Sequence, residues 1–286
     1  MFVNAIAPSD ALISQLIPII DQASHILRHE YEHYVAGNSF DIITKHDNSP
    51  VTQADFKVNQ FITTALGHTF SNIPILSEEG EHEGRHAWEK FWLLDPLDGT
   101  KEFINQRSQF TINLSLVERG ITIFAMLAIP CEHMVYICPL QGMPIKYNLK
   151  TQEWFEYQNQ ISHNHSIQIG LSHSKQKQSK YTDYISVLKK LNSSIVEYRA
   201  GSAYKFCMML EDKVDLYPRF HPTSEWDTSA GQCLLERIGG GLLDFKQRPF
   251  LYNQRATLLN NGFIAYKNSS IKKLAFEALS IMPTND

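Results

Sequence analysis

Residues 91–103, FWLLDPLDGTKEF, constrain this chain more than any other stretch. Four consecutive apolar residues predict a strand buried on both faces, and Pro96, which lacks an N–H for the ladder, predicts that the strand ends at Asp95. Asp98 is then expected in the following turn, and a glycine after it predicts a tight bend into a helix that Thr100 caps. Two carboxylates beside free backbone N–H groups indicate a site for an anion and divalent cations together.

Length and charge exclude several classes of protein. The 286 residues are enough for one large domain or two moderate ones with a full core. The net charge of −4 argues against a nucleic-acid polymer or an anionic membrane as the main partner, since both favour a basic surface. The longest apolar run, residues 121–130, is too short for a transmembrane segment. We therefore expect a small charged ligand.

The cysteines and the N-terminal residues indicate the cellular compartment of the protein. Four cysteines without CxxC spacing lie in apolar contexts, which predicts reduced, buried thiols rather than disulfides or zinc ligands. The first residues lack the basic segment of a signal peptide. Both features indicate a cytoplasmic protein. Peripheral association with the cytoplasmic face of the inner membrane is implied only by the family resemblance described below.

Hydrophobic spacing predicts the elements of the first part of the chain. A helical stripe predicts a first helix over residues 9–35, which Pro18 either kinks or starts. A second amphipathic helix is expected to begin near Thr52. Residues 73–76 are apolar and predict a short strand that ends in Ser-Glu-Glu-Gly.

The pattern then changes twice. Alternation over residues 111–116 predicts a half-buried strand, and the following segments predict an antiparallel meander to about residue 158. From Ile167 onward strands and helices alternate, which is typical of an α/β fold. We predict an α/β (α+β) protein of two halves, 1–160 with most metal ligands and 161–286 with the last ligand and the substrate contacts, packed as one compact unit.

Two acidic residues have an ordinary structural explanation. Asp55 lies three residues after Thr52, and Asp227 lies three residues after Ser224. Each pair fits the capping box that satisfies N–H groups at the start of a helix. Taken alone, each acid is more often a cap than a metal ligand.

The acidic residues taken together favour a metal site. Glu78 and Asp95 end strands, Asp98 follows in a turn, and Asp227 begins a late helix. Strand ends and helix starts can meet at one edge of a sheet. Mg²⁺ prefers oxygen ligands, and two ions close together need carboxylates from several elements. The set therefore predicts a site for two Mg²⁺ ions.

The spacing of the central acids separates two kinds of phosphate chemistry. Phosphatases that form an aspartyl-phosphate need the second aspartate two residues after the first. Asp95 and Asp98 are three residues apart, with Pro96 between them. We therefore expect water, rather than a carboxylate, to be the nucleophile.

These motifs, in their order, resemble the lithium-sensitive inositol monophosphatase superfamily over nearly the whole chain. The resemblance rests on WLLDPLDGTKEF, the preceding Ser-Glu-Glu and the later EWDTSAG. Within the superfamily the chain is most similar to the bacterial 3′(2′),5′-bisphosphate nucleotidases, through DNSPVT at 47–52, Gly-Ser at 201–202, KFC at 205–207 and YPRF at 217–220. The resemblance implies a layered αβαβα sandwich of the sugar phosphatase type and hydrolysis of the 3′-phosphate of adenosine 3′,5′-bisphosphate to AMP.

The resemblance also implies metal ligands at matching positions. Glu78, Asp95 and the backbone carbonyl of Leu97 would bind the first Mg²⁺. Asp95, Asp98 and Asp227 would bind the second. A third, loosely bound ion would lie near residue 45, which is a lysine.

Catalytic and substrate-binding residues follow in the same way. Asp55 would hydrogen-bond Thr100, and this pair would activate the attacking water together with Glu78. Backbone N–H groups at Gly99 and Thr100 would bind the phosphate. The remaining substrate contacts implied by the motifs are Ser202, Lys205, Arg219 and Asp227.

Two other functions fit parts of this pattern. The first is an inositol monophosphatase or another sugar phosphatase of the superfamily. The second is a non-catalytic phosphate-binding protein, whose sequence would have lost Asp55, Thr100 or a metal ligand. None of these residues is lost, which argues against the binding protein, and LDGTKEF and the YPRF segment argue against the sugar phosphatase. Hydrolysis of a phosphorylated nucleotide is therefore favoured.

Overall fold

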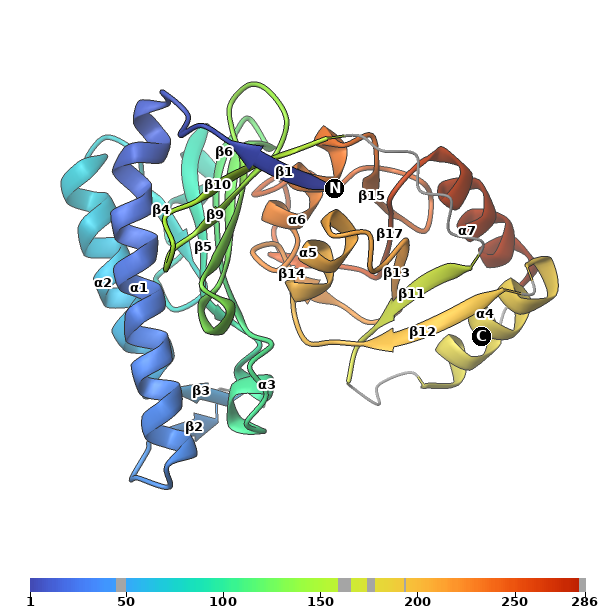
Figure 1. Ribbon diagram of the computed structural model, residues 1–286, viewed down its shortest axis with the longest axis horizontal. Helices are drawn as coiled ribbons and strands as arrows, with labels where there is room; N and C mark the ends of the chain where they lie inside the picture. The colour runs from blue at the N-terminus through green and yellow to red at the C-terminus, as the bar shows by residue number, and fades with distance from the viewer. Residues whose placement is uncertain (45–49, 159–165, 174–177, 193, 283–286) are drawn as a thin grey trace.

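Five layers of helices and sheets make up the computed structural model, which describes residues 1–44, 50–158, 166–173, 178–192 and 194–282. Two long helices cover the outer face of a large sheet, two shorter helices separate that sheet from a second one, and two further helices cover the far side (Figure 1). This αβαβα order is the predicted one. From the first layer to the last, the helices are α1 (Ala11–Val35), α2 (Gln53–Thr69), α5 (Tyr204–Leu210), α6 (Ser229–Arg237), α4 (Gln178–Leu191) and α7 (Ser269–Ile281).

The large sheet has eight strands in the order β1-β10-β9-β8-β7-β6-β5-β4. All neighbours are antiparallel except β4 and β5, which are parallel. This order contains the predicted meander. The strands are β1 (Phe2–Ala5), β4 (Ile75–Ser77), β5 (Lys90–Asp98), β6 (Thr111–Glu118), β7 (Ile121–Ile129), β8 (Met134–Cys138), β9 (Ile145–Asn148) and β10 (Trp154–Tyr157).

The second sheet has five strands in the order β12-β11-β13-β17-β15. The first three are parallel, and β17 runs antiparallel to its two neighbours. The strands are β11 (Ile167–Leu171), β12 (Ile195–Arg199), β13 (Leu216–Arg219), β15 (Gly241–Asp244) and β17 (Phe263–Tyr266). The predicted boundary at residue 160 lies outside the described residues.

Short elements complete the connections. Strand β2 pairs with β3, and β14 pairs with β16. They are β2 (Ile42–Thr44), β3 (Pro50–Thr52), β14 (Thr223–Ser224), β16 (Leu259–Asn260), the short helix α3 (Thr100–Ile104), and the 3₁₀ turns η1 (Arg85–Ala87) and η2 (Pro130–Glu132).

The core lies on both faces of the large sheet. Leu16 of α1 and Val58 of α2 pack with Leu114 on one face, and Phe206 of α5 packs with Leu127 on the other. Helix α6 contacts β6 and β7 directly. The prediction of a half-buried strand over residues 111–116 is therefore wrong, because the α5 and α6 layer also buries its polar alternate residues.

Pro18 does not mark the start of the first helix. The helix begins at Ala11, and the Asp10 side chain caps it by accepting from the N–H groups of Leu12 and Ile13. Pro18 lies inside the helix, directly before buried Ile19. Burial of the apolar stripe offsets the backbone hydrogen bond that a proline removes.

Strand β5 does not end at Asp95, as the proline predicts, but continues to Asp98. Asp95 pairs with Asn113 and Asp98 pairs with Thr111, so β5 advances three residues while β6 advances two. The extra residue forms a β-bulge. Pro96 lies inside this bulge, where the regular ladder is interrupted and a missing N–H does little harm.

Two bulk properties were also predicted. All four cysteines are free, which confirms the prediction of reduced thiols. Among the described residues, no helix combines the length and the apolar character needed to cross a membrane.

Candidate active site

Three carboxylates from two distant parts of the chain meet at the end of β5. Oxygens of Asp95, Asp98 and Asp227 all lie within 4.8 Å of one another. Asp95 and Asp98 belong to β5, and in a regular strand residues three apart point to opposite faces. The bulge between them changes this alternation, so that both side chains reach the same point. The local irregularity of β5 thus creates the predicted cluster.

Electrostatic repulsion within the cluster is strong. Burial, followed by the neighbouring charges of Glu78 and Asp98, raises the pKa of Asp95 well above its ordinary value. Burial and the charge of Asp227 raise the pKa of Asp98 to about 7. Glu78 lines the same cavity. Carboxylates that cannot all ionise together fit a site that cations neutralise, and the all-oxygen donor set suits hard cations such as Mg²⁺.

Asp227 reaches the cluster from a turn rather than from a helix. Helix α6 begins only at Ser229, and Ser224 belongs to β14, so the predicted capping box at this position is wrong. Asp227 Oδ2 instead accepts from the Thr223 hydroxyl and from the Ser224 N–H at 3.1 Å. These donors fix the carboxylate before α6 begins.

Asp55 does combine a cap with a second contact. Its Oδ2 accepts from the Thr52 N–H at 2.8 Å and completes the predicted capping box. Its Oδ1 accepts from the Thr100 hydroxyl at 3.1 Å. Burial raises the pKa of Asp55 to about 6, against the opposing hydrogen bonds from Thr52. Oδ2 of Asp55 therefore serves the helix cap, and Oδ1 makes the contact with Thr100 for which a catalytic role is expected.

Thr100 is not the helix cap that the sequence predicts. Gly99 occupies the cap position with φ 102°, and Thr100 is the first residue of α3. A β-carbon at Gly99 would lie 3.1 Å from Cβ of Ser202, so a side chain there would be both strained and crowded. The Thr100 hydroxyl is thereby left to Asp55 and to the Leu97 carbonyl at 3.3 Å.

Asp98 links strand β5 to the turn before α5. Its Oδ2 accepts from the Ala203 backbone N–H at 2.7 Å and from Asn113 Nδ2 at 3.2 Å. Lys205 stabilises the turn that carries Ala203, because its ammonium donates to the carbonyls of Ala200 and Ser202 at 2.9 and 2.8 Å. Lys205 is 1% exposed and holds the turn that presents Ala203, so the structure places it behind the cavity wall.

The carboxylate cluster opens into a cavity of about 510 Å³. Gly99, Thr100, Ser202, Arg219 and Asp227, five of the predicted substrate contacts, line it. The Nε of Arg219 is buried without a hydrogen-bond partner among the described residues. A ligand oxygen in the cavity could satisfy that donor. Of the other predicted site residues, Asp55, Leu97 and Lys205 lie behind the wall, while Lys45 lies outside the described residues.

For several residues of this wall the sequence analysis predicts no site role. Lys101, Arg107 and His173 line the cavity, together with His221 and Trp226. Trp226 stands in the EWDTSAG motif, directly before the predicted metal ligand Asp227, and this position could have indicated that it lies at the site. Arg107 and His173 stand in no motif, and only the fold brings them to one place.

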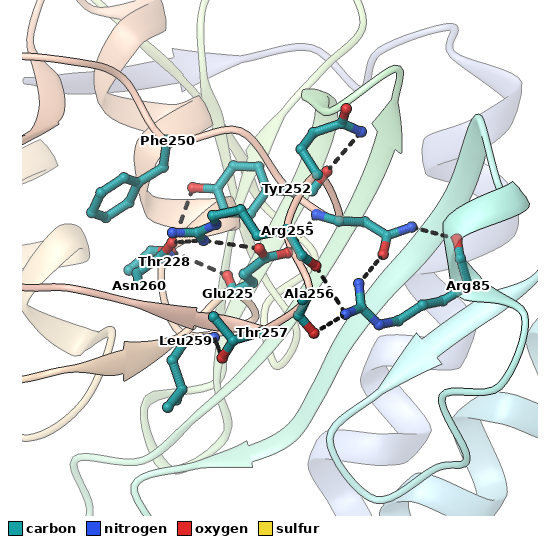
Figure 2. Close-up of polar contacts among 12 residues, drawn as sticks. Arg85, Glu225, Thr228, Phe250, Tyr252, Arg255, Ala256, Thr257, Leu259 and Asn260 are labelled. Carbon is teal, nitrogen blue, oxygen red and sulfur yellow. Dashed lines mark hydrogen bonds and ion pairs between the residues drawn. The ribbon is translucent and has the colours of Figure 1, made fainter.

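A buried polar network holds the segment that carries Asp227 (Figure 2). Glu225 is fully buried and accepts from the Asn253 N–H at 2.5 Å and from Arg255 at 2.9 Å. Arg85 donates to Asn253 Oδ1 at 2.5 Å and to the carbonyls of Arg255 and Ala256 at 2.9 and 2.6 Å. Arg85 follows the loop that begins at Glu78, so the network connects two segments that supply carboxylates to the cavity.

Fold and site define an αβαβα protein with a carboxylate-lined cavity, and comparisons with known proteins agree. The model of the inositol monophosphatase family matches residues 9–281. The chain therefore belongs to this family.

Two relatives and one solved structure indicate which members of the family the chain is similar to. A 3′(2′),5′-bisphosphate nucleotidase CysQ of Escherichia coli O157:H7 is 33% identical over 232 residues, covering 80% of this chain and 90% of the relative. The CysQ of Haemophilus influenzae is 31% identical over 266 residues, covering 92% and 95%. The crystal structure of CysQ from Bacteroides thetaiotaomicron is 29% identical, covers 91% of this chain and 99% of that chain, and has a TM-score of 0.75.

The raised pKa of Asp98 predicts how cation binding depends on pH. A carboxyl whose folded pKa exceeds its unfolded value stabilises the metal-free protein at low pH, and this stability is lost as pH rises from about 4 to about 7. Mg²⁺ competes with that proton. We expect the Mg²⁺-induced rise in Tm to be larger at pH 8 than at pH 6, measured by differential scanning fluorimetry. In Asp98→Asn this pH dependence should shrink; an unchanged dependence would contradict the assignment.

The network around Arg85 predicts a loss of stability. Arg85→Met leaves Asn253 Oδ1 and the partly buried backbone carbonyls of Arg255 and Ala256 without this donor, and we expect the free energy of unfolding to fall by about 2–4 kcal/mol. Urea unfolding measures this change. Arg119→Met is the matched control, since the Arg119 side chain is 79% exposed, and it should change stability by less than about 0.5 kcal/mol. Equal effects of the two substitutions would show that the network contributes nothing.

Proposed function

We propose that this protein is a phosphomonoesterase that hydrolyses the 3′-phosphate of adenosine 3′,5′-bisphosphate to give AMP and inorganic phosphate. The observation that carries the proposal is the Asp55–Thr100 hydrogen bond directly beside the carboxylate cluster. A cluster alone would serve a storage or binding site equally well. A partly buried hydroxyl bonded to a carboxylate adds a route for a proton, and the relatives named above are 3′(2′),5′-bisphosphate nucleotidases.

Two Mg²⁺ ions are the proposed cofactors. Glu78, Asp95 and the Leu97 carbonyl would hold the first, and Asp95, Asp98 and Asp227 the second. The described oxygens fit this role, because carboxylate oxygens of Asp95, Asp98 and Asp227 lie within 4.8 Å of one another, and burial followed by neighbouring carboxylates raises the pKa of Asp95 and of Asp98. When bound, such ions lower the pKa of a water molecule and stabilise the negative charge on the phosphate and the leaving oxygen.

Asp55 and Thr100 receive the proton from the attacking water in this proposal. The Thr100 hydroxyl donates to Asp55 Oδ1, so its lone pairs are available to accept a hydrogen bond from water. A threonine hydroxyl is a weak base by itself. The Asp55 pKa of about 6 lies close to neutral pH, which suits a group that must first be ionised and then take up a proton. Glu78 would orient the same water.

The remaining residues bind and orient the substrate. Backbone N–H groups of Gly99 and Thr100 would hold phosphate oxygens, and Ser202 and Asp227 line the cavity beside them. Arg219 has a buried donor available for a phosphate or ribose oxygen. Lys205 contributes indirectly, by fixing the turn whose Ala203 N–H bonds Asp98.

The two predicted halves then divide the work. Residues 1–160 would supply the proton acceptor and most metal ligands. Residues 161–286 would supply Asp227 and the contacts that choose the substrate. Hydrolysis therefore needs a fixed arrangement of the two halves, and the Asp98–Ala203 hydrogen bond is one contact that maintains this arrangement.

A substrate comparison tests the proposed function. Phosphate release should be fastest for adenosine 3′,5′-bisphosphate with Mg²⁺, and at least about tenfold slower, as kcat/KM, for inositol 1-phosphate and fructose 1,6-bisphosphate. A preference for inositol 1-phosphate would replace the nucleotidase by the alternative sugar phosphatase. Absence of hydrolysis with all three substrates would favour a binding protein.

The hydroxyl of Thr100 gives a separate test of the proton route. Thr100→Val keeps the shape but removes the hydroxyl, and we expect kcat to fall about 10²–10⁴-fold with little change in KM. Thr100→Ser keeps the hydroxyl and is the matched control, expected to retain most of the activity. A change confined to KM in Thr100→Val would make Thr100 a binding residue only.

A further inference from the structure

Asn113 lies among the carboxylates but has no part in the proposed hydrolysis. It belongs to β6 and pairs with Asp95 across the ladder, while Thr111 pairs with Asp98. Residues directly opposite each other in an antiparallel pair point to the same face of the sheet. Both polar side chains are buried, with exposures of 2% for Asn113 and 0% for Thr111. Two polar residues of β6 are thus placed beside the carboxylate cluster.

The orientation of the Asn113 amide follows from its neighbours. Its Oδ1 accepts from the Thr111 hydroxyl at 2.9 Å. Its Nδ2 donates to Asp98 Oδ2 at 3.2 Å and to the Trp226 carbonyl at 3.4 Å. A carbonyl oxygen only accepts, so the group that faces Trp226 is the NH₂. The same NH₂ therefore contacts one proposed metal ligand and the residue directly before another.

This amide connects two segments that are distant in the sequence. Asp98 ends β5, and Trp226 precedes Asp227 in the turn before α6. Thr223 and Ser224 also bond Asp227, but they belong to the same segment and do not fix its position relative to β5. The contact with the Trp226 carbonyl does, because its donor is anchored in the large sheet.

A neutral donor suits this position. Oxygens of Asp98 and Asp227 lie within 4.8 Å of one another, so their negative charges repel and favour separation of the two segments. A lysine or arginine would offset this repulsion, but its charge would compete with the cations. An amide holds the segments together without adding a charge. The ligands are then arranged before a cation binds, which favours tighter binding.

We propose that Asn113 is a positioning residue of the metal site, and that its amide raises the affinity for Mg²⁺ by holding Asp98 and the turn of Asp227 together. This inference rests on the metal ligands of the proposed function. Asn113 acts through these two carboxylates and does not touch the reacting atoms. Its loss should therefore weaken cation binding and leave the chemical step largely intact once Mg²⁺ saturates the site.

Calorimetry of the substrate-free protein tests this role directly. Isothermal titration with MgCl₂ gives the dissociation constant for Mg²⁺ in the wild type and in Asn113→Leu, which keeps the approximate size but removes the donor. We expect this constant to rise about tenfold, as for the loss of a hydrogen bond to a charged group.

Asn268→Leu is the matched control. The Asn268 side chain caps α7, in the outer helical layer of Figure 1, by accepting from the Ile271 N–H at 3.0 Å. Loss of the cap should lower Tm, but the dissociation constant for Mg²⁺ should stay within about twofold of the wild type. An equal rise in this control would overturn the inference, because the effect would then follow from lost stability alone.

The Mg²⁺ dependence of turnover gives a second readout. The half-saturating Mg²⁺ concentration should rise about tenfold in Asn113→Leu, whereas kcat at saturating Mg²⁺ should stay within about threefold of the wild type. A purely structural role would lower Tm without changing the half-saturating concentration, and a direct part in catalysis would lower kcat at saturation. Either result would contradict the positioning role.

A milder variant and the wild type complete the test. In Asn113→Ser the hydroxyl is too short to reach both partners, so this variant decides the question if the leucine variant does not fold; an unchanged dissociation constant would overturn the inference. A wild type that does not bind Mg²⁺ would overturn the proposed ligands and the role of Asn113 together. A wild type that binds Mg²⁺ without hydrolysing the nucleotide would overturn the nucleotidase alone, since weaker binding in the Asn113 variants would still support positioning.

Discussion

Mutual repulsion among buried carboxylates is the constraint on which the rest of this structure depends. Asp95, Asp98 and Asp227 share one point, and Glu78 adds to the field there. Burying several such groups costs stability unless they are protonated, hydrogen-bonded or bound to cations. Hydrogen-bond donors offset part of this cost, because the Ala203 N–H bonds Asp98 and the β14 residues Thr223 and Ser224 bond Asp227. The five layers hold these donors in place.

Much of this arrangement could be predicted from the sequence, because its signals are local. The apolar run before Asp95, the Gly-Thr bend and the Thr52–Asp55 capping box each depend on residues a few positions apart. The alternation of strands and helices after Ile167 predicted the second sheet for the same reason. The motif order then supplied the family, which the comparisons confirm. Local patterns therefore predicted the individual elements, and the family resemblance predicted which of their residues meet at the site.

The errors have a common physical cause, since each depends on contacts between distant residues. The bulge in β5 exists only against the register of β6, so Pro96 alone suggested a strand end. Polar residues of β6 are buried because α5 and α6 cover them from the other half. Lys205, a predicted substrate contact, is almost fully buried and donates to two backbone carbonyls of the turn beside the cavity, which local sequence does not indicate. The network of Arg85 and Glu225 has no local signature at all.

The distribution of charge in the cavity bears on which phosphate esters the site accepts. A site built only from carboxylates and cations would accept any phosphomonoester, since the ions respond to charge and not to the rest of the ligand. Selectivity must come from groups away from the reacting phosphorus. Of the side chains that line the cavity away from the carboxylates, Arg107 follows α3 and His173 follows β11 in the other sheet. Their placement depends on how the two sheets are packed together. Substitutions in these loops can therefore change the substrate while the carboxylate cluster stays the same, which is how one fold serves several phosphatases.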